Sequence, residues 1–195
     1  MDAVTLARCT SASFDRAQLY AEHLTAGMDR FRINNPGRMA CFLATVAIES
    51  ERLEDVEEGL SYSTADRLRA IFPSLFVAAK GGKYRAEDYV RNRKGLSQIR
   101  YGGFHGRGLI QLTWEKNYAA AGDALGLDYV AQPSLLLEPK HAALTAAWFF
   151  ADHAQCLPAA DRGDMYDITG RVNGLARLQL QARKDQMTTA LKVLL

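Results

Sequence analysis

The chain has 195 residues, a length that suits one domain or one core divided between two lobes. Hydrophobic residues make up 48% of it, charged residues make up 24% and the net charge is +2, which is the balance of a globular protein and argues against a nucleic-acid partner. The longest nearly apolar runs, 39–48 and 142–151, reach about half of the ~20 residues that a membrane span needs, and the N-terminus lacks a secretory pattern, so we expect no stable membrane insertion and no signal peptide.

The first predicted helix covers residues 14–31, where apolar residues recur at helical spacing. Asn35 is then expected to cap a second helix, with Pro36 as its first residue. Because residues 36–48 are apolar nearly all round, we expect this helix to be buried at the centre of the protein and to end at the burst of charge that begins with Glu49.

Two short elements follow. A helix capped by Ser63 or Thr64 is expected to stop at Pro73, because proline cannot continue a helix interior. A second short helix, over 86–94, is expected to end at Gly95.

The remaining chain begins with a glycine-rich stretch, 95–108, that predicts a loop or tight turns. Three further helices are expected: one capped by Thr113 and running through about Leu125 with Gly126 just past its end, a buried one over 140–152 that Pro139 opens, and a last one from about Leu175 to Leu194. No βαβ alternation and no internal repeat is present, so the predicted fold class is all-α.

Several kinds of chemistry find no support in the sequence. The three cysteines, Cys9, Cys41 and Cys156, are odd in number and far apart, which predicts buried thiols and synthesis in a reducing compartment. The four histidines show no H-E-x-x-H pairing, and the glycine-rich segment fits neither a dinucleotide fingerprint nor a phosphate loop. We therefore expect no metal and no cofactor.

Charge changes sign along the chain. Residues 48–66 are strongly acidic, and residues 80–107 are strongly basic. The two segments form either two walls of a cleft or two separate solvated faces.

An acid pair remains as candidate chemistry. Glu49 ends a buried helix, where both burial and the negative helix terminus favour its protonated form. Glu58 follows nine residues later, among other acids and next to Gly59, and is expected to be more exposed and ionised. Two carboxyl groups in contrasting environments are typical of the acid and base of a glycosidase.

Four segments together strengthen this interpretation: "AIES" at the end of the buried helix, "EEGLSYS" after it, "GRGLIQLT" over 106–113, and "RVNG" near the C-terminus. Together they resemble the family 19 glycoside hydrolases, which are chitinases and related phage endolysins. The resemblance covers roughly residues 39–175 and implies a lysozyme-like helical fold with two lobes around a substrate cleft. The N-terminal helix and the overall size of the chain are more similar to the compact endolysin branch than to plant chitinases. We expect a single catalytic domain over 1–195 with no separate wall-binding domain.

The resemblance implies roles for five residues. Glu49 would be the general acid, Glu58 the base that activates water, and Thr113 the hydroxyl residue that holds this water. Gln111 and Asn173 would bind the sugar from opposite sides of the cleft. Three further substrate-binding candidates follow from side-chain chemistry rather than from the resemblance: Tyr62 and Tyr101, whose rings can stack on sugars, and Arg107.

More than one role stays open at several of these positions. Thr113 is also a good helix N-cap, Asn173 before glycine is also typical of a plain turn, and Arg107 either pairs with the acids or holds a turn. The chain also departs from the family pattern: Ile48 replaces a histidine, "ESERL" lacks the usual glycines, and "RVNG" has one glycine where two are usual.

The first functional hypothesis is an inverting, endolysin-type hydrolase of the β-1,4 bonds of peptidoglycan. It would be a monomer held in the cytoplasm of the host bacterium, released through a separate holin-type pore, and active on glycan strands in the periplasm. The competing hypotheses are a chitinase acting on chitin oligomers, a sugar-binding protein that has lost catalysis, and a lytic transglycosylase with a single acid.

Overall fold

The structure, a computed structural model, describes residues 1–195 and consists of helices and loops without a β-sheet. The α-helices are α1 (Ala3–Thr10), α2 (Phe14–Arg30), α3 (Pro36–Glu49), α4 (Ala65–Ile71), α5 (Pro73–Phe76), α6 (Arg93–Tyr101), α7 (Glu115–Leu125), α8 (Pro139–Trp148), α9 (Leu157–Asp161), α10 (Met165–Asn173) and α11 (Leu180–Leu194). Shorter helical turns cover Ala78–Lys80, Ala86–Tyr89, Pro133–Leu137 and Phe149–His153. The all-α prediction is confirmed, and none of these helices has both the length and the hydropathy to cross a bilayer.

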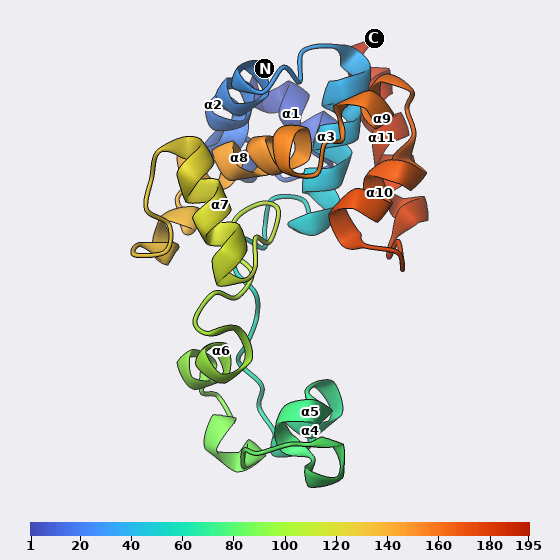
Figure 1. Cartoon of the computed structure of the whole chain (residues 1–195). Coiled ribbons are helices and arrows are strands. Elements are labelled where there is room, and N and C mark those ends of the chain that lie inside the picture. The colour runs from blue at the N-terminus through green and yellow to red at the C-terminus, as the bar shows by residue number, and fades with distance from the viewer.

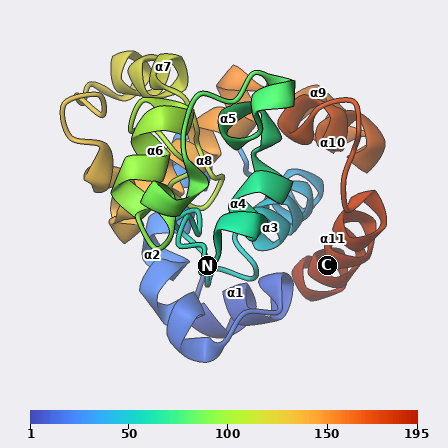
Figure 2. The same cartoon turned by 90° about the horizontal axis from the view of Figure 1, so that it is seen from below.

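The helices form two lobes of unequal size (Figure 1). The small lobe, residues 60–101, holds α4, α5 and α6, and the large lobe holds the other helices. Two linking segments, 54–59 and 102–108, join the lobes. Seen from the small-lobe end, α6 lies on the side of α7 and α8, and α10 and α11 lie on the opposite side (Figure 2).

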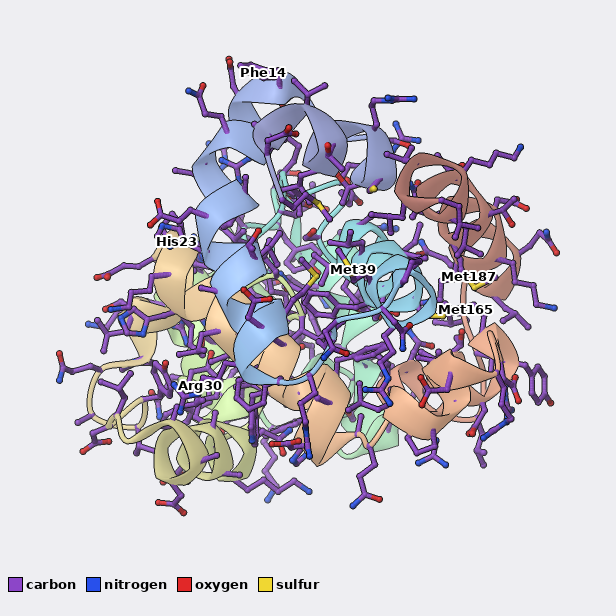
Figure 3. All side chains as sticks on the ribbon, turned by 90° about the horizontal axis from the view of Figure 1, so that it is seen from above. Phe14, His23, Arg30, Met39, Met165 and Met187 are labelled. Carbon is purple, nitrogen blue, oxygen red and sulfur yellow. The ribbon has the colours of Figure 1, made fainter.

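The large lobe is built around α3. Asn35 caps this helix by accepting a hydrogen bond from the Arg38 amide at 2.8 Å, and Pro36 is its first residue, as predicted. Its residues from Ala40 to Ala47 are all buried, because α1, α9 and α11 pack around it. In the view from above, Met39 of α3 lies near the centre, with Met165 and Met187 on α10 and α11 beside it (Figure 3).

Helices α2 and α8 pack closely because small residues meet at their contact. A Cβ atom on Gly27 would lie 3.1 Å from the Cβ atom of Ala147, so the two backbones approach as nearly as side chains allow. Along α2, Leu24 and Met28 face the core while Phe14, at the start of the helix, is exposed at the periphery (Figure 3). The three cysteines are buried free thiols, as expected.

The small lobe has its own minor core. Six buried side chains form it: Leu60, Leu68, Phe72, Phe76, Ala86 and Leu96. Thr64 caps α4 by accepting from the Arg67 amide, and Pro73 ends α4 but starts α5. The lobe presents its partly buried Tyr62 and Tyr101 toward the acid-rich segment that follows α3.

Three predicted boundaries are wrong. Gly95 does not end a helix but lies in the first turn of α6, where its amide donates to the Asn92 side chain at 2.9 Å. Thr113 does not cap α7, because Trp114 occupies that position with a positive φ of 76°. The last helix begins at Leu180 rather than at 175, and residues 174–179 form a loop instead.

Candidate active site

A cavity of about 560 Å³ opens where the large lobe meets the acidic linking segment. Its lining includes four of the predicted site residues, Glu49, Glu58, Gln111 and Asn173, and only two hydrophobic residues, Ile48 and Leu178. The other lining residues are Glu51, Asp55, Glu57, Gly59, Gln179 and Arg183. The chain thus brings the two candidate catalytic carboxyl groups into one polar, acid-rich cavity. No group of three or more His, Cys, Asp or Glu side chains is placed to hold a metal ion.

Glu49 is the last residue of α3 and is mostly buried, with 17% of its side chain exposed. Its Oε1 atom accepts a hydrogen bond at 2.5 Å from Nη2 of Arg183, a residue of α11 that is 1% exposed. The buried guanidinium of Arg183 therefore fixes the direction of the Glu49 carboxyl group. The environment expected for Glu49 from the sequence did not include Arg183, its principal partner.

Glu58 lies in the linking segment and is held at both oxygens. The Tyr101 hydroxyl donates to Oε1 at 2.6 Å, and the Gly106 amide donates to Oε2 at 3.0 Å. The Glu58 amide also donates to the Gly106 carbonyl at 2.9 Å. Glu58 is half-buried, and its carboxylate is fixed in direction by one side chain and one backbone group.

Gln111 lies in the tight turn between Arg107 and Leu112, whose backbones pair in both directions. It has a positive φ of 51°, and its Nε2 atom donates to the carbonyl of Asp55 at 3.2 Å. A Cβ atom on Gly106 would lie 2.7 Å from the Gln111 Oε1 atom, so only glycine leaves this side chain in place. Glycine at 106 therefore makes room for the glutamine that lines the cavity.

Thr113 lies beside Gln111 and does not line the cavity. Its hydroxyl donates to the Gln111 carbonyl at 2.8 Å, and it lies 3.4 Å from a Cβ position on Gly106, whose amide binds Glu58. This places the hydroxyl close to the turn that holds the candidate base. Its predicted capping role is wrong, whereas a role next to Glu58 stays a prediction.

Asn173 is the last residue of α10, and its Oδ1 atom accepts from the Leu178 amide at 3.0 Å. This bond orders the loop after α10 and leaves the amide nitrogen for the cavity that Asn173 lines. Tyr62 and Tyr101 do not line this cavity. Tyr62 packs edge-on against Phe72 in the small lobe, and Tyr101 supports Glu58.

Arg107 does not line this cavity either. Its Nη1 atom donates to the Gly103 carbonyl at 3.2 Å and to the Tyr118 hydroxyl at 2.9 Å, and its Nε atom lies 3.6 Å from Oε1 of Glu57. Arg107 therefore does both things that the sequence left open, since it pairs with an acid and holds a turn.

Comparisons with known proteins agree with this architecture. The family model of class I chitinases, glycoside hydrolase family 19, matches residues 72–176, more than half of the chain. The chain belongs to this family. As a family 19 member it is a glycoside hydrolase, so the predicted family and enzyme class are confirmed. The matched residues include Gln111, Thr113 and Asn173 but begin after Glu49 and Glu58.

The relatives of this family 19 chain differ in how much of it they match. The glycosyl hydrolase family 19 domain-containing protein of Haemophilus influenzae (strain ATCC 51907 / DSM 11121 / KW20 / Rd) is 28% identical over 169 residues, covering 77% of this chain and 78% of that protein. Endochitinase At2g43590 of Arabidopsis thaliana is 42% identical over 62 residues, covering 31% of this chain. The chain spans less than a quarter of the plant chitinases that it matches, and 23% of this one.

The fold of this family 19 chain is shared with a solved structure. A bacterial family 19 chitinase superposes with a TM-score of 0.62 at 24% identity, over 98% of this chain and 93% of that one. This likeness and the absence of a sheet confirm the predicted mainly helical, lysozyme-like fold with two lobes.

Sequence reasoning missed three ionisable residues of this site region. Arg183 lies on the same face of α11 as the buried Gln186 and Ala190, so a charge within a buried helical stripe was a usable signal. Glu57 was hidden among neighbouring acids, and no motif assigned a role to His105. Nothing local in the sequence shows that His105 and Glu57 meet, because 48 positions separate them.

Proposed function

We propose that this glycoside hydrolase cleaves the β-1,4 bonds of peptidoglycan by an inverting mechanism, with Glu49 as acid and Glu58 as base. The observation that carries the proposal is the pair of carboxyl groups lining one cavity with different partners: Arg183 binds Glu49, whereas Tyr101 and the Gly106 amide bind Glu58. Inverting glycosidases need one acid and one base, about 6.5–9.5 Å apart with water between them. We expect the Glu49 and Glu58 carboxyl groups to lie in this range with substrate bound.

In the proposed reaction Glu49 gives its proton to the glycosidic oxygen as the bond to the anomeric carbon breaks. Glu58 removes a proton from a water molecule, whose oxygen attacks the anomeric carbon from the opposite face. Arg183 then stabilises the carboxylate that Glu49 becomes, since charge-assisted hydrogen bonds are stronger than neutral ones. The hydroxyl of Thr113 helps to hold the attacking water.

The choice of peptidoglycan over chitin rests on two supports. The bacterial relative matches most of its own length, whereas the plant chitinases match over a short segment. The N-terminal helix of the chain also resembles that of the compact endolysin branch. The proposal includes a monomeric enzyme that reaches the periplasmic wall from the cytoplasm through a separate pore and causes lysis of the host.

Chitin is the competing substrate, because it has the same β-1,4 linkage. Two further functions compete with hydrolysis itself: lytic transglycosylation, and sugar binding without catalysis. The transglycosylase reaction needs a single acid and no base for water. The fixed orientation of the Glu58 carboxylate favours hydrolysis over that reaction.

The test is digestion of purified Gram-negative peptidoglycan and of chitin oligomers side by side, with products identified by mass spectrometry. We expect reducing-end muropeptides from the wild type, uncut chitin, and no products from Glu49→Gln. Glu54→Gln is the matched control, because Glu54 is an exposed carboxylate that does not line the cavity. Cleavage of chitin alone, anhydro products, or binding without cleavage would each overturn the proposal.

A further inference from the structure

A second cavity, of about 470 Å³, lies on the other side of Glu57. It is lined entirely by polar residues and glycine, including Arg93, Lys94, Arg107 and His105. Glu57 also lines the acidic cavity that contains Glu49 and Glu58. Glu57 is the one residue that lines both cavities, so the two cavities adjoin at this linking segment.

The acidic side chain of this second cavity is already satisfied within the protein. The Oε1 atom of Glu57 accepts from Nε2 of His105 at 3.0 Å and contacts Nη2 of Arg93. Since a carboxylate only accepts, the Nε2 atom of His105 donates, and its Nδ1 atom accepts from the Ser97 hydroxyl at 2.6 Å. Glu57 is thus held by a chain of hydrogen bonds that ends inside α6.

The cavity consequently has an excess of positive charge. Burial raises the pKa of Glu57, but hydrogen bonds from His105 and Arg93 outweigh it, so this pKa is lowered and the carboxylate stays charged. Burial lowers the pKa of His105, which keeps the ring neutral at pH 7. One carboxylate therefore faces three cations, Arg93, Arg107 and Lys94.

Two of these cations have donors to spare. Lys94 is exposed at the start of α6 and takes no part in the ion pairs of Glu57. The Nε atom of Arg107 is buried without a hydrogen-bond partner and lies 3.6 Å from the Glu57 carboxylate. A buried donor without a partner is costly, which favours a ligand that supplies an acceptor.

We propose that this cavity, lined by Arg93, Lys94 and Arg107, binds a carboxylate of the peptide branches of a glycan strand while the strand occupies the adjacent acidic cleft. This rests on the proposed function. An extended peptide spans about 3.3–3.6 Å per residue, so a branch of a few residues reaches around the Glu57 segment from one cavity to the other. Chitin carries neither peptide nor carboxylate, so the cavity would set the preference for peptidoglycan.

The test compares three glycan substrates of equal chain length: strands with free peptide carboxylates, the same strands with these carboxylates amidated, and strands stripped of peptide. Each is cut by the wild type, by Lys94→Glu and by Lys140→Glu, a matched change at an exposed lysine outside both cavities. We expect Lys94→Glu to lower kcat/KM about five-fold on the free-carboxylate strands alone, mainly through KM, because it reverses one exposed charge. Lys140→Glu should match the wild type on all three.

The outcomes separate this proposal from the proposed function. Equal cleavage of free and amidated strands by the wild type would overturn the carboxylate site and leave the hydrolase intact. An equal loss of activity by Lys94→Glu on all three substrates would reveal a structural effect and also overturn it. If no strand is cut, the binding of the free peptide and of its amidated form to the wild type and to Lys94→Glu is measured by titration. Binding of the free peptide alone, weakened by Lys94→Glu, supports the carboxylate site. Equal binding of the two peptides, or no binding, overturns it.

Discussion

The two lobes differ in how much interior each one has. The large lobe encloses a core of 38 buried residues around α3, whereas six buried residues form the core of the small lobe. Because burial of apolar surface drives folding, the large lobe has a wide margin of stability and the small lobe has little. We infer that the small lobe opens locally at a lower free energy than the large lobe unfolds.

The difference matters because the lobes support different parts of the candidate site. Glu49 and Arg183 both belong to helices of the large lobe, where neighbouring side chains fix them. Glu58 lies on a linking segment and takes one of its two side-chain hydrogen bonds from Tyr101 at the end of α6. The proposed acid is therefore held by the stable lobe, and the proposed base depends on the less stable one.

The largest expected effect comes from Glu58→Gln. The amide cannot take a proton from water, so we expect kcat to fall by about 10²–10⁴-fold, the usual contribution of a general base. Tyr101→Phe removes one hydrogen bond but leaves the carboxylate, and should cost much less. Rates of muropeptide release by both variants, with thermal unfolding as the check on folding, decide between a catalytic and a structural role. Full activity of Glu58→Gln would rule out the proposed base.

A matched pair of core substitutions tests the contrast between the lobes directly. Leu43 and Leu68 are both fully buried, one in each core. Leu43→Ala should lower the free energy of global unfolding by about 3 kcal/mol, as expected for a leucine deleted from a packed interior. Leu68→Ala should leave the global transition nearly unchanged but speed amide hydrogen exchange in α4 to α6. A common loss of global stability in both variants would show that the lobes unfold together.

The contact between Arg183 and Glu49 links α11 to α3. Arg183→Met removes the cation from a site that is 1% exposed and leaves a mostly buried carboxylate without its partner. We expect a loss of about 2 kcal/mol, smaller than for a fully buried pair because water reaches part of Glu49. Urea unfolding of Arg183→Met, Glu49→Gln and the double variant measures the coupling between the two side chains. An additive cycle would mean that the contact contributes nothing to stability.

The sequence predicted the parts of the fold that follow from local patterns. Helical spacing over 14–31 and the Asn35–Pro36 start gave α2 and α3 almost to the residue, because caps and apolar stripes are local signals. The placement of Gly95 in α6 was missed, since the Asn92 side chain compensates a glycine that by itself indicates a loop. Likewise α10, which presents Asn173 to the cavity, lay in a stretch for which no helix was predicted.

The partners in the candidate site were harder to predict than its members. Glu49, Glu58, Gln111 and Asn173 were named from motifs, and the structure places all four on one cavity. The contact of Glu49 with Arg183 joins positions 134 residues apart, and no periodic pattern encodes such a contact. The electrostatic expectation for Glu49 left out Arg183 for the same reason, because this charge comes from a distant helix.

The smallest expected effect concerns the turn that leaves α3. Glu51, Arg52 and Leu53 all have positive φ values, of 45°, 61° and 70°, where the motif "ESERL" offers no glycine. A side chain on a residue with left-handed backbone costs roughly 1–2 kcal/mol. Replacing that residue by glycine removes this cost, but part of the stabilisation is lost because glycine increases the conformational entropy of the unfolded chain.

Arg52 is the residue of this turn to change, because its side chain is exposed and Leu53 belongs to the core. Arg52→Gly should raise the free energy of unfolding by about 0.5–1 kcal/mol. Arg8→Gly, at an exposed position within helix α1, should instead lower it by about the same amount. Opposite shifts of the urea midpoint would establish that backbone strain is stored one turn from Glu49. Shifts in the same direction would mean that the surrounding contacts, rather than the backbone, set the conformation of this turn.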